Sequence, residues 1–307
     1  MGALPRVVVR LMVVISLILG TSSSIAQSEA TSWLGRTLER PSIPDETRTT
    51  FEANLETART AWEASPDDEE RIIWYGRRIA YLGRYQEAIE VFTAGLASNP
   101  DSYRLYRHRG HRYITTRQLS EAIADLERAA ALAVDQPDQI EPDGLPNARN
   151  APTSTDHTNI WYHLGLAHYL AGDFPRAHRA FDECAQRSTT DDMHCAAAYW
   201  RFLSRSRYDG IDAARADIDF VSGDLDIIEN DAYHALLMLF AGRLARADVT
   251  PPDDGVQNAT LAYGLATWDL LHGRYDAAQQ QYDAITSSST WAAFGFIAAE
   301  AEIARRF

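Results

Sequence analysis

The chain has 307 residues, of which 46% are hydrophobic and 23% are charged, and its formal net charge at pH 7 is −14. This composition is typical of a folded protein and excludes the intrinsically disordered class. All 29 basic residues are arginine, and the acidic balance argues against nucleic-acid binding, which needs a positive field.

The first 26 residues have the pattern of a secretory signal peptide. Arg6 and Arg10 flank the start of an apolar run at 11–19, and a small-x-small cleavage site ends at Ala26. The alternative is an uncleaved anchor, but the apolar run is too short to span a bilayer. We therefore expect an exported protein, periplasmic or secreted, with no membrane insertion after cleavage.

Three segments of the chain repeat one pattern of glycine, aromatic and alanine residues. They are LGRYQEAIEVF at 82–92, AGDFPRAHRAF at 171–181 and HGRYDAAQQQY at 272–282. Bulky apolar residues continue this register at steps of 34, 34, 55, 34, 36 and 31 residues: Phe51, Tyr85, Leu119, Phe174, Tyr208, Leu244 and Tyr275. A period near 34 indicates stacked helix–turn–helix units, which must pack together to bury their apolar faces.

The unit at 161–181, WYHLGLAHYLAGDFPRAHRAF, resembles the tetratricopeptide repeat family. Trp161, Leu164 and Gly165 match its W-x-x-L-G pattern, and Ala177 and Phe181 match its A-x-x-x-F pattern. The resemblance covers about residues 45–285. It implies an all-α, right-handed superhelical solenoid of such repeats, to which the sequence adds a C-terminal capping helix at 290–307. In this family the first helices of the repeats line a concave face that binds proteins or peptides.

The chain divides into four predicted parts. After the signal peptide at 1–26 come a lone N-terminal helix and repeats at 27–134, a proline-rich inter-repeat loop at 135–158, and further repeats at 159–307 that degenerate towards the capping helix. Long loops inside compact arrays are uncommon and often functional. We expect this one to fold back and bury Ile140 or Leu145; the alternative is a floppy insertion.

The segment YRLYRHRGHRYITTR at 103–117 is a basic island in this acidic chain. At about 100° per residue, five of its side chains share one face of a first helix: Arg104, Arg107, His108, His111 and Thr115. Neighbouring first helices add further arginine, histidine and aromatic residues. The predicted partner-binding residues are Arg77, Tyr81, Arg104, Arg107, His108, His111, Tyr162 and His163. Arginine and aromatic side chains are common interface anchors, and Arg104 and Arg107 would form the electrostatic core for an acidic protein or peptide. The alternative is a solvated face balanced by neighbouring acids.

Nothing in the sequence proposes a catalytic residue, a metal ligand set or a cofactor site, since no nucleophile, phosphate-loop or metal motif is present. We interpret the chain as a non-enzymatic scaffold. One alternative is a hydrolase or carbohydrate-active enzyme on a helical scaffold, which facing carboxylates in one cavity would favour. Another is a purely structural assembly factor that acts through the convex face or the end caps.

The chain has two cysteines, Cys184 and Cys195. Export permits a disulfide, and Cys195 takes a start-of-repeat position that could approach the end of the preceding second helix. We predict a disulfide between them; the alternative is two small buried thiols.

Overall fold

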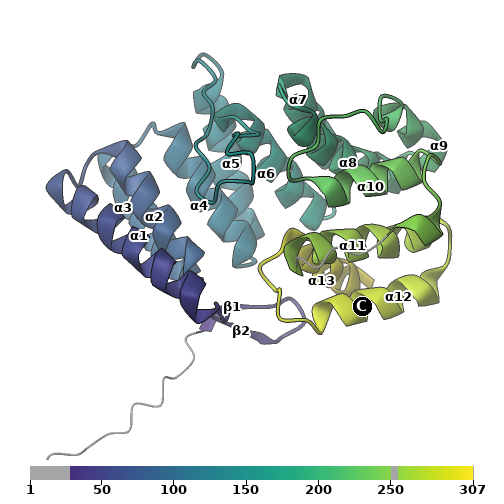
Figure 1. Ribbon diagram of the computed structural model, residues 1–307, viewed down its shortest axis with the longest axis horizontal. Helices are drawn as coiled ribbons and strands as arrows, with labels where there is room; N and C mark the ends of the chain where they lie inside the picture. Colours follow the sequence, from purple (N-terminus) through teal and green to yellow (C-terminus); the bar gives the residue numbers. More distant parts are fainter. Residues whose placement is uncertain (1–27, 250–254, 307) are drawn as a thin grey trace, which may run out of the picture.

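The computed structural model describes residues 28–249 and 255–306, and within these ranges its regular secondary structure is almost entirely helical (Figure 1). Antiparallel helix pairs stack side by side, so the predicted all-α repeat solenoid is confirmed. The predicted signal peptide lies outside the described residues.

The array starts with a short antiparallel hairpin of β1 (Ser28–Thr31) and β2 (Thr37–Glu39). The helices of the N-terminal half are α1 (Asp45–Ala64), α2 (Glu69–Tyr81), α3 (Tyr85–Ser98), α4 (Tyr103–Thr115) and α5 (Leu119–Ala133). Those that follow are α6 (Asp156–Leu170), α7 (Phe174–Arg187), α8 (Asp191–Tyr208), α9 (Ile211–Ala214), η1 (Arg215–Ile218), α10 (Asp231–Phe240), η2 (Arg246–Asp248), α11 (Gly255–Leu271), α12 (Tyr275–Thr286) and α13 (Phe294–Arg306).

The repeated glycine–aromatic pattern marks the turns inside the helix pairs. Gly83, Gly172 and Gly273 have φ angles of 71°, 82° and 75°, a left-handed conformation that glycine adopts without steric cost. The second helices α3, α5, α7 and α12 then begin at Tyr85, Leu119, Phe174 and Tyr275.

The pattern fails in the degenerate region of the array. Tyr208 ends α8 instead of preceding a second helix, and Leu244 lies in the turn after α10. Short elements, α9 with η1 and then η2, stand where full second helices were expected.

Small residues sit where paired helices approach closely. A Cβ atom on Gly76 would lie 2.3 Å from the Phe92 ring, and one on Gly165 would lie 2.9 Å from the Phe181 ring. The alanines that recur at one register position are fully buried: Ala88, Ala122, Ala177 and Ala278. The repeated spacing of small and large side chains therefore forms the helix seams.

The two ends of the array meet, which the sequence did not predict. The hairpin runs from the base of α1 towards the C-terminal helices (Figure 1). The backbone N–H of Trp33 donates to Glu300 Oε1 of α13 at 2.6 Å, and the indole Nε1 of Trp291 donates to the Glu39 carbonyl at 2.9 Å. The helix α13 thus closes the array instead of only capping its end.

The predicted disulfide is wrong, because Cys184 and Cys195 are both free and buried. The Cys184 thiol points from α7 into its seam with α6, where Sγ donates to the Thr158 carbonyl at 3.3 Å. Burial raises the pKa of both thiols, that of Cys195 to about 12. The alternative of two buried thiols holds.

Candidate functional site

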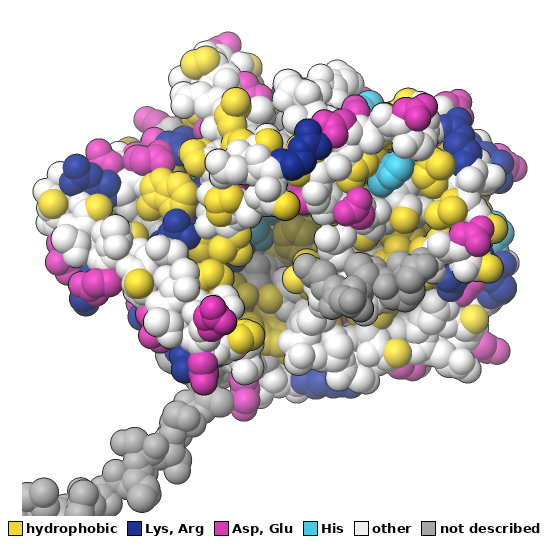
Figure 2. Space-filling model, viewed as in Figure 1, with side chains coloured by type: hydrophobic (Ala, Val, Ile, Leu, Met, Phe, Trp, Pro, Cys, Tyr) yellow, Lys and Arg dark blue, Asp and Glu magenta, His cyan; other side chains and the backbone are white. Residues whose placement is uncertain are grey.

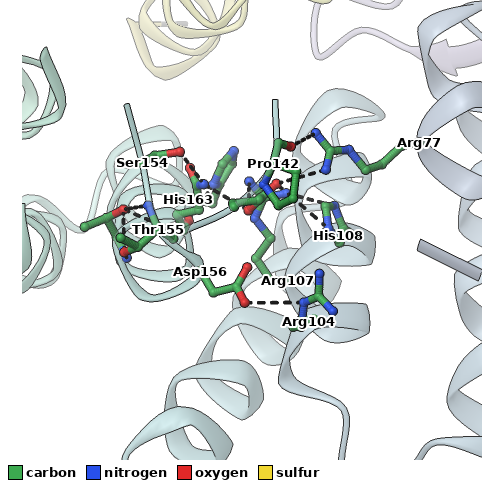
Figure 3. A network of polar contacts seen from close by, with 12 residues as sticks. Arg77, Arg104, Arg107, His108, Pro142, Ser154, Thr155, Asp156 and His163 are labelled. Carbon is green, nitrogen blue, oxygen red and sulfur yellow. Dashed lines mark hydrogen bonds and ion pairs between the residues drawn. The ribbon is translucent and has the colours of Figure 1, made fainter. Parts of the chain in front are cut away.

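The inter-repeat loop lies over the face of α2, α4 and α6 that was predicted to form an open groove (Figure 3). Its residue Glu141 is buried at 5% exposure. The Glu141 carboxylate lies 3.0 Å from Arg107 Nη2 and 3.6 Å from Arg77 Nη1, and it accepts a hydrogen bond from Asn159 Nδ2 at 2.9 Å. A carboxylate of the chain itself thus occupies the centre of the predicted arginine cluster.

The loop backbone provides further contacts with α2. Arg77 Nη2 donates to the Pro142 carbonyl at 3.0 Å, and Arg78 Nη1 donates to the Gly144 carbonyl at 2.9 Å. Gly144 also packs directly on the Tyr81 hydroxyl, leaving no room for a side chain. The predicted folding of the loop onto the array is confirmed, and polar groups hold it there.

The apolar pair in the loop has a different position from the one predicted. Ile140 is 68% exposed and Leu145 is 55% exposed. The expectation that one of them is buried is therefore wrong, because arginine side chains on α2 and α4 contact the loop through its Glu141 carboxylate and its backbone carbonyls.

Arg104 is also paired within the chain. Its Nη1 lies 2.6 Å from Glu70 Oε2, and its Nε lies 3.3 Å from Asp156 Oδ2. Burial raises the pKa of Asp156 to about 6, even though Arg104 lowers it. Arg104 and Arg107 do not line an open, unpaired groove, which corrects that expectation: their carboxylate partners come from α2, α6 and the loop.

Two other predicted site residues are part of the core. His108 is 5% exposed and stacks on Phe92 with ring centroids 5.7 Å apart. The Tyr162 hydroxyl is hydrogen-bonded to the Tyr233 hydroxyl and to Trp200 Nε1, each at 2.9 Å. Neither side chain projects from an open concave surface.

His111 and His163, two of the predicted site residues on neighbouring first helices, lie side by side. Their ring centroids are 4.2 Å apart, and the Phe294 ring lies 5.4 Å from His111 and 5.8 Å from His163. Burial holds the pKa of each imidazole well below 6.5, and the positive charge of nearby Arg112 lowers it further. Both rings are therefore neutral at pH 7.

A cavity of about 470 Å³ opens beside this histidine pair; we call it the central cavity. Figure 2 shows the molecule hollowed between the N-terminal helices and the C-terminal half, with hydrophobic side chains on the walls. Its lining includes Tyr85, His111, Arg112, Thr115, Ala293 and Phe294. A smaller cavity of about 120 Å³ shares His111 and Arg112 with it and extends to Glu141.

Arg112 is the site residue that the sequence did not single out. It belongs to the predicted arginine-rich segment, but its spacing puts it off the helical face that Arg104 and Arg107 share, so it was not among the predicted binding residues. Only the closure of the array, which brings Ala293 and Phe294 opposite α4, places Arg112 in a cavity wall.

A larger cavity of about 660 Å³ lies between residues 40–43, α1 and the α2–α3 turn. Three of the four arginines in its lining are paired with glutamates on its own rim: Arg48 with Glu52, Arg59 with Glu56 and Arg84 with Glu87. The fourth, Arg40, is paired with Glu29. Exposed pairs of this kind leave little net charge for a ligand, so we consider the central cavity the better candidate site.

Within residues 28–249 and 255–306, no group of three or more His, Cys, Asp and Glu side chains could hold a metal ion. In the same ranges no helix is both long enough and apolar enough to cross a membrane.

No protein-family model matches the chain, and no functionally curated protein does either. Among solved structures, it is similar to a tetratricopeptide repeat protein from Parabacteroides merdae, at 14% identity over 82% of this chain and 94% of that one, with a TM-score of 0.48. It is also similar to YrrB, a TPR protein with an unusual peptide-binding site, at 13% identity over 82% of this chain and all of that one, with a TM-score of 0.43. The corresponding values for MamA are 19% identity, 57% and 90% coverage, and a TM-score of 0.43. Similarity at this level says nothing about ligands, and the fold assignment rests on the repeated helix pairs of the chain itself.

Proposed function

We propose that this protein, a helical repeat of the tetratricopeptide type, is an exported, non-enzymatic scaffold that binds a protein or peptide at the central cavity. The observation that carries this proposal is the combination of aromatic and apolar walls with one arginine, Arg112, in a cavity of about 470 Å³. Aromatic and arginine side chains in partly enclosed positions are typical anchors for a partner.

The arrangement of carboxylates favours binding over hydrolysis. Glycoside hydrolysis generally uses two facing carboxylates. The described residues that line the central cavity include no carboxylate, and the adjoining small cavity has one, Glu141. Because Glu141 is paired with Arg107 at 3.0 Å, it supports the position of the loop and is not a candidate acid or base.

Export is supported by the signal-peptide pattern alone. The test is fractionation of cells that express the full chain, followed by N-terminal sequencing of the exported product. A mature protein that begins at Gln27 in the envelope or the medium is expected. An uncleaved protein in the cytoplasm would refute this part of the proposal.

The binding site is tested by affinity capture from envelope extract with matched variants. Ala292→Trp should fill the central cavity, since Ala292 is partly exposed on its wall, and should abolish capture of the partner. Ala94→Trp is the control, because Ala94 is exposed on α3 away from this cavity. Both variants should keep the helical circular dichroism and the unfolding midpoint of the parent. Equal capture by a folded Ala292→Trp protein would contradict the proposal.

A further inference from the structure

Within the described residues, one arginine of the arginine-rich segment at 103–117 has no carboxylate partner. Four of its five arginines each have a carboxylate partner within 3.0 Å: Arg104 with Glu70, Arg107 with Glu141, Arg109 with Asp125 and Arg117 with Glu300. Among the described residues, the Arg112 guanidinium has neither a hydrogen bond nor an ion pair. The guanidinium lies over the Tyr85 ring, whose centroid is 5.5 Å from Cζ.

The surroundings of Arg112 increase the positive potential. Arg107 and Arg77 both act on it with charge of the same sign, and the neighbouring His111 is neutral. In the small cavity, three guanidinium groups face the single carboxylate of Glu141, so a net positive charge is left over. Burial lowers the pKa of Arg112 to about 10, which still leaves it fully charged at pH 7. A half-buried charge without a counter-ion is costly, and a bound anion would relieve that cost.

The shape of the site indicates the kind of anion. Arg112 lies where the central cavity and the small cavity meet, and the wall beyond it is formed by Tyr85, Ala293 and Phe294. One guanidinium can hold one carboxylate in a bidentate fork, and the apolar and aromatic wall beyond Arg112 favours an anion that carries an apolar body over inorganic phosphate. The neighbouring Arg107 already binds a carboxylate, that of Glu141.

We propose that Arg112 binds the carboxylate of a ligand whose apolar body fills the central cavity. The proposal rests on the proposed function, since it assumes that this cavity is a binding site. The carboxylate belongs either to an Asp or Glu residue of a partner segment, next to a hydrophobic residue, or to a free organic acid.

Calorimetric titration at pH 7.5 with pairs of probes that match in shape and differ in charge tests the proposal. The first pair is 3-phenylpropanoate and its amide; the second is the blocked tripeptide Phe-Glu-Phe and its Phe-Gln-Phe counterpart. The acid of at least one pair should bind the parent protein, and its amide should bind at least about tenfold more weakly. Tighter binding of the tripeptide acid identifies a partner side chain, and tighter binding of the small acid identifies a free organic acid.

Two variants of Arg112 and one control assign the binding to this side chain. Arg112→Gln should weaken acid binding at least about tenfold, equivalent to about 1.4 kcal/mol. Arg112→Lys should weaken it less, because the charge stays while the fork is lost. Arg128→Gln, which removes an exposed arginine on α5, should leave binding unchanged. Arg112→Gln should fold, since it removes no ion pair, and Arg112→Lys gives a second measurement.

The proposal is overturned if no acid binds, if acid and amide bind equally, if inorganic phosphate binds more tightly than the acids, or if both Arg112 variants bind like the parent. Partner capture distinguishes this failure from failure of the proposed function. If Ala292→Trp loses the partner while Arg112→Gln keeps it, the cavity is a binding site, but its binding does not depend on recognition of a carboxylate by Arg112.

Discussion

Arg117 and Glu300 form a buried ion pair that joins the N-terminal repeats to α13. Arg117 Nη2 lies 2.9 Å from Glu300 Oε2, and the side chains are 2% and 1% exposed. The same carboxylate accepts the Trp33 N–H at 2.6 Å, and Arg117 Nη2 also donates to the Trp291 carbonyl at 2.8 Å. We predict that breaking this pair loosens the closure of the array.

The expected magnitude follows from the burial of both charges. Burial lowers the pKa of Arg117 although Glu300 raises it, so desolvation outweighs attraction. Removing one partner leaves the other charge buried and alone, which costs about 3–5 kcal/mol of unfolding free energy. Glu300→Gln should cost this amount, because the amide oxygen can still accept the Trp33 N–H while Arg117 loses its counter-ion.

Arg117→Gly should cost less than Glu300→Gln. Arg117 has a φ angle of 68° at the turn position that glycine takes in the preceding repeat, Gly83. Glycine adopts this left-handed conformation without strain, which stabilises the variant by about 1 kcal/mol. The net loss in unfolding free energy is then roughly 2–4 kcal/mol. The double variant should lose at least about 2 kcal/mol less than the sum of the single losses, since it leaves no unpaired charge.

Urea unfolding of the parent, the two single variants and the double variant measures these losses in unfolding free energy. Amide hydrogen exchange of residues 28–39 reports whether the array stays closed. The single variants should lose protection in the hairpin before they lose it in α3 or α7. Arg128→Gln, which breaks an exposed pair, should change stability by less than about 1 kcal/mol. Single losses below about 1 kcal/mol, or losses that add within about 0.5 kcal/mol in the double variant, would refute the reasoning.

Three further predictions concern titration, the loop and the thiols. Burial, together with nearby arginines, holds the pKa values of His108, His111 and His163 well below 6.5. The contribution of each neutral imidazole to the unfolding free energy is therefore complete above pH 6.5 and is lost as the pH falls. The loss is roughly 1.2 kcal/mol for each histidine between pH 7.0 and 5.5. Burial raises the pKa of Asp156 to about 6, so this carboxyl takes up a proton in the folded state and offsets about 0.8 kcal/mol of the histidine loss. Urea unfolding should show a net loss of roughly 3 kcal/mol in unfolding free energy from pH 7.0 to pH 5.5. Equal stability at both pH values would contradict this prediction. Glu141→Gln should speed limited proteolysis in the 135–158 loop, because Arg107 loses its carboxylate, whereas an unchanged cleavage rate would mean that backbone contacts alone hold the loop. Both cysteine thiols should resist a thiol reagent until urea unfolds the chain and should then react without prior reduction; an unreactive unfolded chain would instead mean that they are disulfide-bonded.

The sequence predicted the helix pairs because their signals are local. The register that runs through Tyr85, Leu119, Phe174 and Tyr275 gives the first residue of four second helices. In such a pair, a small residue packs against a large one about 16 positions later, as Gly76 does against Phe92. Periodicity within 34 residues is sufficient to reveal such contacts.

The candidate site depends on contacts between distant segments, which periodicity does not report. Arg107 meets Glu141 from the loop, and Arg117 meets Glu300 from the last helix. Arg107 lies on α4 and Arg117 in the turn after it, and both carboxylates come from outside the α4–α5 pair. The loop and the closure of the array decide which charges are paired, and they leave Arg112 as the one in the cavity wall.

The central claim is that a partner binds in the central cavity. Hydrogen–deuterium exchange of the captured complex tests it directly, because it reports where the partner protects the backbone. We predict new protection in residues 103–118 and 289–294, which line the cavity from opposite sides, and no change in α9 or α12. Protection confined to the convex face, with the two cavity segments unchanged, would contradict the account.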